Sequence, residues 1–250
     1  MNKKQLVIKK LHQNNISDVL NLQQRIVDGL HPDEKHFILN RTQEDYMKYL
    51  NKENSSMVGI FDKDKLIAQA VYCTPNSGEQ REMPEFRPDI PNEELVIYEA
   101  ILVDPTYRGS SLMKQMLSYI ETNAIDAQRT HSIIQIAIDN PASWINALHH
   151  GMSITKVDKD PVDDVKVIYL EKDIKSAHAF KLPPKDVYSM FLGDNIHKKI
   201  PSLFNKMQYI INEGYKGAQF NKATQSLVWI KEDQSNVMAL VLSQKLLSRA

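Results

Sequence analysis

The pattern of apolar and polar positions predicts a regular succession of strands and helices along the first 174 residues. Short apolar runs predict strands at 5–11, 56–61, 65–73, 95–103, 131–139, 154–158 and 165–174. Apolar residues at helical spacing predict helices from Ser17 to Gly29, over 37–50, over 110–128 and over 140–152, with Ser17 as a cap. The order β-α-α-β-β-β-α-β-α-β-β indicates an α/β (α+β) fold, and the very apolar run 95–103 is typical of a central strand.

Residues 75–94 interrupt this pattern with four prolines and six acidic residues. They predict a long exposed loop, and loops of that length in compact domains are often functional. The alternative is a mobile insertion with no role.

Residues 176–250 follow a different pattern after a linker that ends in Pro-Pro. We expect helices at 186–192 and at about 202–212. The apolar runs 226–230 and 237–242, separated by KEDQSN, predict a hairpin. The chain therefore divides into residues 1–175 and a small C-terminal α+β unit of unknown role, residues 176–250.

The composition and the charge distribution narrow the classes of partner that this chain could bind. The chain is 42% hydrophobic and 25% charged, which is ordinary for a globular protein, and its formal charge of zero does not favour a nucleic-acid scaffold. Residues 1–175 carry 21 basic and 26 acidic side chains, whereas residues 176–250 carry 10 and 5. This split, together with the aromatic residues of the second unit, predicts that residues 180–250 dock on the core or on a second copy by apolar contact and charge.

The cysteine and histidine content argues against a metal site and a disulfide. Cys73 is the only cysteine, and the eight histidines show no ligand spacing. We see neither a signal peptide nor a membrane span, and we expect a cytoplasmic protein.

The segment TYRGSSLMKQML, residues 106–117, joins the central strand to a helix through a turn with a glycine and two serines. Backbone N–H groups from Ser110 through Ser111, Leu112 and Met113 to Lys114 would face outward at the helix start, where aligned dipoles favour a phosphate. Arg108 and Lys114 would add charge-assisted hydrogen bonds. The alternative is that Ser110 or Ser111 simply caps the helix.

The segment ILVDPTYRGSSLMKQML resembles the acyl-CoA-binding segment of the GCN5-related N-acetyltransferases (GNAT). The residues that match that motif are Ile101, Val103, Pro105, Tyr107, Arg108 and Gly109. NPASWINALHHGM resembles the family's second motif through Asn140, Ser143, Gly151 and Met152. The resemblance covers about residues 5–174, and the C-terminal residues lie outside it.

The resemblance implies a GNAT fold whose fourth and fifth strands splay apart in a V, with acetyl-CoA as the co-substrate and no metal. It places the pyrophosphate at Arg108, Gly109, Ser110, Ser111, Leu112, Met113 and Lys114, and the thioester carbonyl at the backbone of Ile101, Leu102 and Val103. Asn140 would hydrogen-bond the pantetheine arm, with Ser143 beside it.

Glu99 is the candidate catalytic base. A carboxylate inside so apolar a strand is costly to bury unpaired, so it faces a cleft or has a partner. Its place six residues before Pro105 matches a glutamate with which many relatives deprotonate the amine. A structural ion pair is the alternative.

Three positions depart from the family pattern. Ser111 stands for a glycine, Met113 for a small residue, and Ala147 for a tyrosine that often serves as the acid. His149 and His150 are nearby, but a helix turns at least one of them away from the site.

The resulting hypothesis is a transferase that moves an acetyl group from acetyl-CoA to a primary amine of a small molecule or peptide. It involves no nucleic acid and no membrane, and it allows a homodimer. We keep two alternatives: a catalytically silent CoA-binding module, and an adaptor that works through its basic C-terminal unit. The acidic first unit favours a cationic acceptor.

Overall fold

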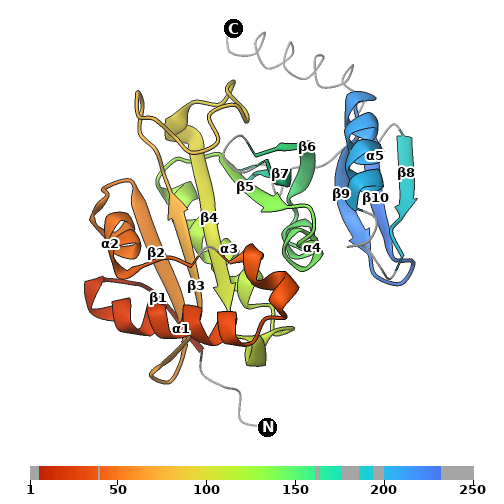
Figure 1. The fold of residues 1–250 in the computed structure, drawn as a ribbon. Coiled ribbons are helices and arrows are strands. Elements are labelled where there is room, and N and C mark those ends of the chain that lie inside the picture. The colour runs from red at the N-terminus through yellow and green to blue at the C-terminus, as the bar shows by residue number, and fades with distance from the viewer. Residues whose placement is uncertain (1–5, 39, 161–163, 176–185, 194–199, 232–250) are drawn as a thin grey trace, which may run out of the picture.

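The computed structural model describes residues 6–38, 40–160, 164–175, 186–193 and 200–231 (Figure 1). Its strands form one mixed sheet in the order β1-β2-β3-β4-β5-β7-β6-β9-β10-β8. The bounds are β1 Leu6–Lys10, β2 Ser55–Asp62, β3 Lys65–Cys73, β4 Leu95–Val103, β5 His131–Ala137, β6 Ser153–Lys159, β7 Lys166–Asp173, β8 Asp186–Phe191, β9 Lys216–Asn221 and β10 Ser226–Lys231.

Helices cover both faces of this sheet. Their bounds are α1 Ile16–Asp28, α2 Gln43–Asn51, α3 Leu112–Asp126, α4 Pro141–His149 and α5 Ile200–Asn212. The apolar side chains of α1 and α2 pack on one face of β2–β4, and those of α3 pack on the other face. α4 lies beside α3 and packs on β6, β7 and β9. The predicted order of elements up to β7 is confirmed.

Two predicted helix starts were wrong. Ser17 lies inside α1, whose N-cap is Asn15. The helix expected from residue 37 begins only at Gln43, because Thr42 and Asp45 form a reciprocal capping box there.

The predicted splay between the fourth and fifth strands is present. β4 pairs in parallel with β5 from Leu95 opposite His131 to Tyr98 opposite Ile134, and the pairing ends there. On its other edge β4 shifts register against β3 between Tyr98 and Ala100, so Glu99 is the extra residue of a β-bulge. The edge of β4 from Glu99 to Val103 therefore faces an open V.

The C-terminal unit differs from the prediction in two ways. Residues 186–191 form the edge strand β8 and not a helix, and β9 was missed. The predicted helix at 202–212 is present as α5. β10 pairs with β9 on one edge and β8 on the other, and the second strand of the predicted hairpin, 237–242, lies outside the described residues.

This unit continues the sheet of the first unit. Ile154 of β6 pairs with Gly217 of β9, and a Cβ added at Gly217 would lie 3.1 Å from the Cβ of Ile154. Phe220 meets Trp144 of α4 edge to face at 6.5 Å between ring centroids. Phe220, Leu227 and Trp229 belong to the same buried cluster as Trp144 and Ile154, so the described residues of this unit make the apolar part of the predicted contact with the core.

A buried charged cluster joins α3, α4 and β7. The Glu121 carboxylate contacts Lys172 Nζ at 2.6 Å and His150 Nε2 at 2.9 Å, and it accepts hydrogen bonds from Ser132 and Tyr98. Burial alone would raise the pKa of Glu121, but His150 and Lys172 lower it overall. The carboxylate therefore stabilises the fold in its charged form.

Truncation after Ile174 should uncover the apolar surface of α4 and β6 that Phe220 and Trp229 bury. We expect the shortened protein to unfold at a lower temperature and to bind an apolar dye, as seen by thermal unfolding and dye fluorescence. An equally heat-stable, dye-negative fragment would show that the two units are energetically independent.

Glu121→Gln should destabilise the protein by roughly 3 kcal/mol at pH 7, because Lys172 is left buried without its counter-charge. Since the folded pKa is lowered, the contribution of Glu121 is present above its ordinary value of 4.5 and is lost as the pH falls through the folded pKa. The difference between wild type and variant in urea unfolding should thus shrink below about pH 4.5. Asp126→Asn, an exposed change on the same helix, is the control and should have little effect.

Candidate active site

The turn after β4 is held in place by Asp104, which is buried. Its carboxylate accepts hydrogen bonds from Thr106 and contacts Arg25 Nε at 3.1 Å and Lys65 Nζ at 3.0 Å. Burial alone would raise the pKa of Asp104, but these partners lower it strongly. Tyr107 adds a second anchor through a 2.7 Å hydrogen bond from its hydroxyl to Asp62.

The residues after this turn leave backbone N–H groups at the start of α3. Gly109 has φ of 77° and Ser111 has φ of 58°, both in the left-handed region. Ser111 is the N-cap residue of α3, as the alternative interpretation expected, but its side chain makes no capping hydrogen bond. The first intrahelical bond runs from Gln115 N to Ser111 O, and the N–H groups of residues 112–114 precede it.

A cleft of about 460 Å³ lies between this helix start, the open edge of β4 and the start of α4. It brings together most of the predicted cofactor-binding residues. Those that line it are Ile101, Leu102, Val103, Arg108, Gly109, Ser111, Leu112, Met113, Lys114, Asn140 and Ser143. Ser110 and Glu99 do not line this cleft.

The start of α4 forms the second wall. Asn140 is its N-cap, and its side chain accepts a 3.2 Å hydrogen bond from Ser143 N. Of the two histidines at the other end, His149 lines the cleft and His150 is buried against Glu121. His149 Nε2 lies 3.4 Å from the carbonyl oxygen of Phe220. His150 is therefore the histidine that the helix turns away from the cleft.

Glu99 sits at the bulge, on the face of the sheet that carries α1 and α2. Its Oε1 accepts a 2.6 Å hydrogen bond from Cys73 Sγ, which also lies 2.9 Å from Ser55 Oγ, and Tyr49 of α2 provides a second hydrogen bond. Burial and these hydrogen bonds raise the pKa values of Cys73 and Tyr49 to about 12 each. Both groups therefore remain protonated donors, and Glu99 is held as the acceptor.

The long loop 75–94 packs on the same face. Phe86 and Ile90 are buried beside Cys73, and the Phe86 ring lies 4.8 Å from that of Tyr169. The Arg81 guanidinium binds the carbonyl oxygens of residues 86, 87 and 90, so this loop has a defined path over the sheet.

The sequence did not indicate several further contributors to the cleft. Leu30, Glu34 and Ile38 reach it from the segment between α1 and α2, and Asn146 reaches it from α4. Only the folded chain brings 30–38 beside 101–114, since no local pattern links two segments so distant in sequence. Glu34 is the acidic member of the lining.

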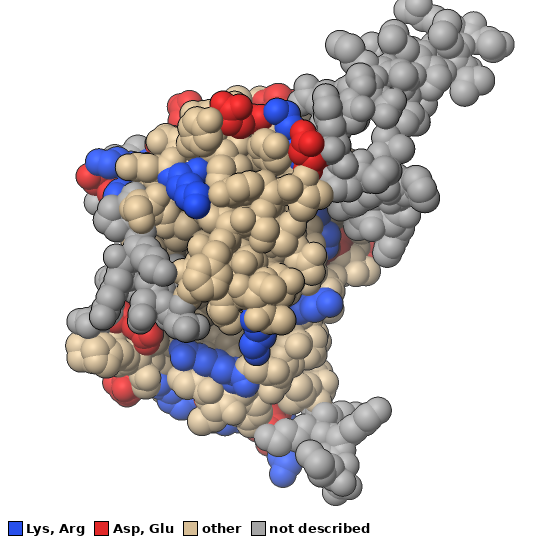
Figure 2. Space-filling model, turned by 90° about the vertical axis from the view of Figure 1, so that its right-hand side faces the viewer, with Lys and Arg blue, Asp and Glu red and all other residues tan. Residues whose placement is uncertain are grey.

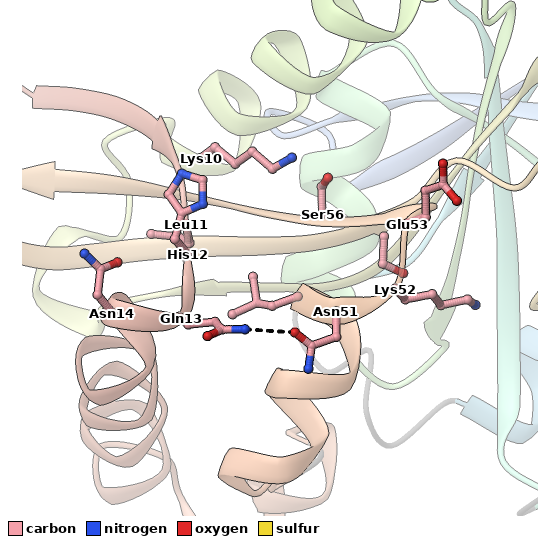
Figure 3. Close-up of a pocket in the computed structure, with 11 residues that line it drawn as sticks. Lys10, Leu11, His12, Gln13, Asn14, Asn51, Lys52, Glu53 and Ser56 are labelled. Carbon is pink, nitrogen blue, oxygen red and sulfur yellow. Dashed lines mark hydrogen bonds between the residues drawn. The ribbon is translucent and has the colours of Figure 1, made fainter.

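A second hollow, of about 620 Å³, lies where β1 turns away from β2 (Figure 3). Figure 3 shows Lys10, His12 and Lys52 around it, with Gln13 Nε2 donating a 2.9 Å hydrogen bond to Asn51. It contains none of the predicted site residues, and most of its lining side chains are exposed. The splayed cleft is thus the better candidate for chemistry.

The described residues contain no cluster of His, Cys, Asp and Glu able to hold a metal ion. Among them, no helix combines the length and the apolar character needed to cross a membrane.

Residues 17–151, more than half of the chain, match the model of the acetyltransferase (GNAT) family. Similar solved structures include an N-acetyltransferase from Staphylococcus aureus Mu50, with 17% identity, a TM-score of 0.52 and coverage of 68% of this chain and 98% of that one. The ribosomal-protein-S18-alanine N-acetyltransferase from Escherichia coli matches at 13% identity and a TM-score of 0.50, covering 73% and 99%.

A third structure, yncA from Salmonella typhimurium with its cofactor acetyl-CoA, matches at 14% identity and a TM-score of 0.50, covering 70% and 96%. At these identities the likeness concerns the fold. A search of curated proteins found no match.

Gly109→Asp should abolish the thermal stabilisation of this protein by CoA, because a carboxylate would lie among the N–H groups of residues 112–114. Gly78→Asp is the matched control: Gly78 has φ of 78° and, like Gly109, nothing within 4 Å of an added Cβ. The two glycines have nearly the same φ, so both variants should carry similar backbone strain. A loss of CoA-induced stabilisation in Gly109→Asp alone would therefore report on the phosphate site. Undiminished stabilisation of Gly109→Asp by CoA would refute that assignment.

Proposed function

We propose that this chain, which belongs to the acetyltransferase (GNAT) family, moves an acetyl group from acetyl-CoA to a primary amine of a small molecule or peptide. The observation that carries the proposal is the cleft at the splay, where the open edge of β4 meets the start of α3, whose N-cap side chain makes no hydrogen bond to the helix. This cleft combines a helix start that could bind an anion with the gap between the separated strands β4 and β5.

The lining residues fit the cofactor's parts. The N–H groups of residues 112–114, with Arg108 and Lys114, would bind the pyrophosphate. The backbone of Ile101, Leu102 and Val103 would lie along the pantetheine arm, and Asn140 and Ser143 would hold that arm from the other wall. When bound, acetyl-CoA supplies an acyl group activated as a thioester.

Glu99 is the proposed general base. A primary amine is protonated near neutral pH and must lose a proton before it can attack a carbonyl. The hydrogen bonds from Cys73 and Tyr49 hold the Glu99 carboxylate in one position, from which it would accept that proton directly or through water.

The acceptor would approach from the side of α1 and α2, which carries Glu99 and the loop 75–94. Glu34 in the cleft lining and the net charge of −5 on residues 1–175 favour a cationic amine. We expect the reaction to occur in the cytoplasm, without nucleic acid or membrane, and a homodimer is compatible with it.

Glu99→Gln should keep the affinity for CoA and lower turnover by roughly 100-fold or more, the usual contribution of a general base. Turnover should recover in part at high pH, where the amine loses its proton unaided. The measurement is release of CoA thiol with a panel of amines, and Glu93→Gln, an exposed change six residues upstream, is the control.

Wild-type turnover by Glu99→Gln at neutral pH would exclude Glu99 as the base. If the wild-type protein binds CoA but releases no thiol with any amine, the transferase proposal itself fails.

A further inference from the structure

Two polar side chains follow the point where β4 and β5 separate. The last pair of the parallel ladder is Tyr98 opposite Ile134. The next residues of the two strands are Glu99 and Gln135, and both are partly exposed. They are therefore the first side chains beyond the closed end of the gap along which the proposed function places the pantetheine arm.

Gln135 lies on the same face of the sheet as Glu99. Successive side chains of a strand alternate between faces, and Ile133, two residues earlier, shares a buried cluster with Cys73. Cys73 is the hydrogen-bond partner of Glu99. Tyr169, which pairs directly opposite Gln135 in β7, belongs to the same cluster. The proposed base and Gln135 therefore both face the side from which the acceptor would approach.

Asp160 fixes the orientation of the Gln135 amide. Gln135 Nε2 donates a hydrogen bond to the Asp160 carboxylate, and an ionised carboxylate can only accept. Exchanging the amide oxygen and nitrogen would set two acceptors against each other, so Oε1 is turned away from Asp160. Asp160 follows β6, and in the strand order β4-β5-β7-β6 the gap lies on the opposite side of β5 from β6.

The side of the C-terminal unit offers no comparable site for a cationic acceptor. Figure 2 views the molecule from that side, where the described residues leave the centre as a broad surface without charged side chains. The splay, in contrast, combines the carboxylate of Glu99 with the oriented amide of Gln135.

We infer that Gln135 Oε1 accepts a hydrogen bond from the acceptor amine, so that Glu99 and Gln135 hold the nitrogen between them. This inference rests on the proposed function and extends it to the choice of acceptor. Two hydrogen bonds of about 2.9 Å at a tetrahedral angle join one nitrogen to oxygens about 5 Å apart. Neighbouring strands lie about 5 Å apart, so side chains at the head of the gap suit this separation.

Two acceptor oxygens at this place select an amine over a hydroxyl group. A primary ammonium group has three N–H bonds, so it can give one proton to Glu99 and still donate to Gln135 Oε1. An alcohol has a single O–H bond, and once this points to Glu99 an oxygen lone pair faces Oε1. Two acceptors without a proton between them gain no hydrogen bond and leave Oε1 unsatisfied.

Gln135→Met keeps the side-chain length and removes the acceptor oxygen. With cadaverine, lysinamide and a short peptide with a free N-terminus as acceptors, it should lower kcat/KM for the fastest amine about tenfold or more. The affinity for CoA and the unfolding temperature should not change, because Gln135 contacts the amine and not the cofactor. Gln24→Met is the matched control, since Gln24 Nε2 donates a 2.7 Å hydrogen bond to Asp28 on an exposed part of α1.

An unchanged kcat/KM in Gln135→Met would overturn the inference. A fall in CoA affinity and in unfolding temperature that matches the loss of activity would also overturn it, because Gln135 would then be a structural residue.

Asp160 is a positioning residue, because it acts on the amine through Gln135. An asparagine at this position can donate or accept, so Asp160→Asn should release the amide and lower kcat/KM by a smaller factor. The double variant with Gln135→Met should lose no more activity than Gln135→Met alone. Losses that multiply in the double variant would overturn the assigned role of Asp160.

The side-chain amide signals of Gln135 report on the acceptor without turnover. They are assigned in nuclear magnetic resonance spectra of isotope-labelled protein by their loss in Gln135→Met. They should shift when one of the three amines is added to the CoA-bound protein. A shift in a protein that releases no thiol would refute the transferase and keep the inference. Thiol release without any shift would overturn the inference and keep the transferase, and the absence of both would overturn both.

Discussion

The end of hydrogen bonding between β4 and β5 after Tyr98 and Ile134 is the constraint on which the site depends. The bulge at Glu99 adds one residue to β4 against β3, which bends the strand and increases its twist at that point. Beyond the bulge the two strands no longer meet, so β4 presents an unpaired edge to the cleft. The same bulge directs the Glu99 carboxylate toward Cys73 and Tyr49, so the slot and the proposed base arise from one irregularity.

Where two neighbouring strands separate, the turns and loops around them must be held in place, and buried charged side chains do this. Asp104 holds the turn before the anion site through Arg25 and Lys65. Arg129 donates to the carbonyl oxygens of Thr74, Pro75, Asn92 and Leu95, and so ties both ends of the long loop to the sheet. Asp104 and Arg129 are themselves buried, where an unpaired charge would be far more costly than in water.

The parts of the fold that the sequence predicted are those with strong local signals. The apolar runs of β2 to β5 and the turn at Arg108-Gly109 are of this kind. β8 was misread because its residues are exposed on both faces except Met190, so their periodicity reflects no single buried side. Pairing with β10 decides its conformation. Glu34 was missed for the same reason, since its place in the cleft depends on long-range packing of the segment between α1 and α2.

The C-terminal unit, although outside the family match, bears on the cleft through α4. One side of this helix presents Asn140, Ser143 and His149 to the cleft, and the opposite side buries Trp144 against Phe220 of β9. α4 is only nine residues long, and so short a helix derives its stability mainly from packing. The wall that would hold the pantetheine arm is therefore supported from behind by β9, and the position of β9 depends in turn on its pairing with β10, which pairs with β8.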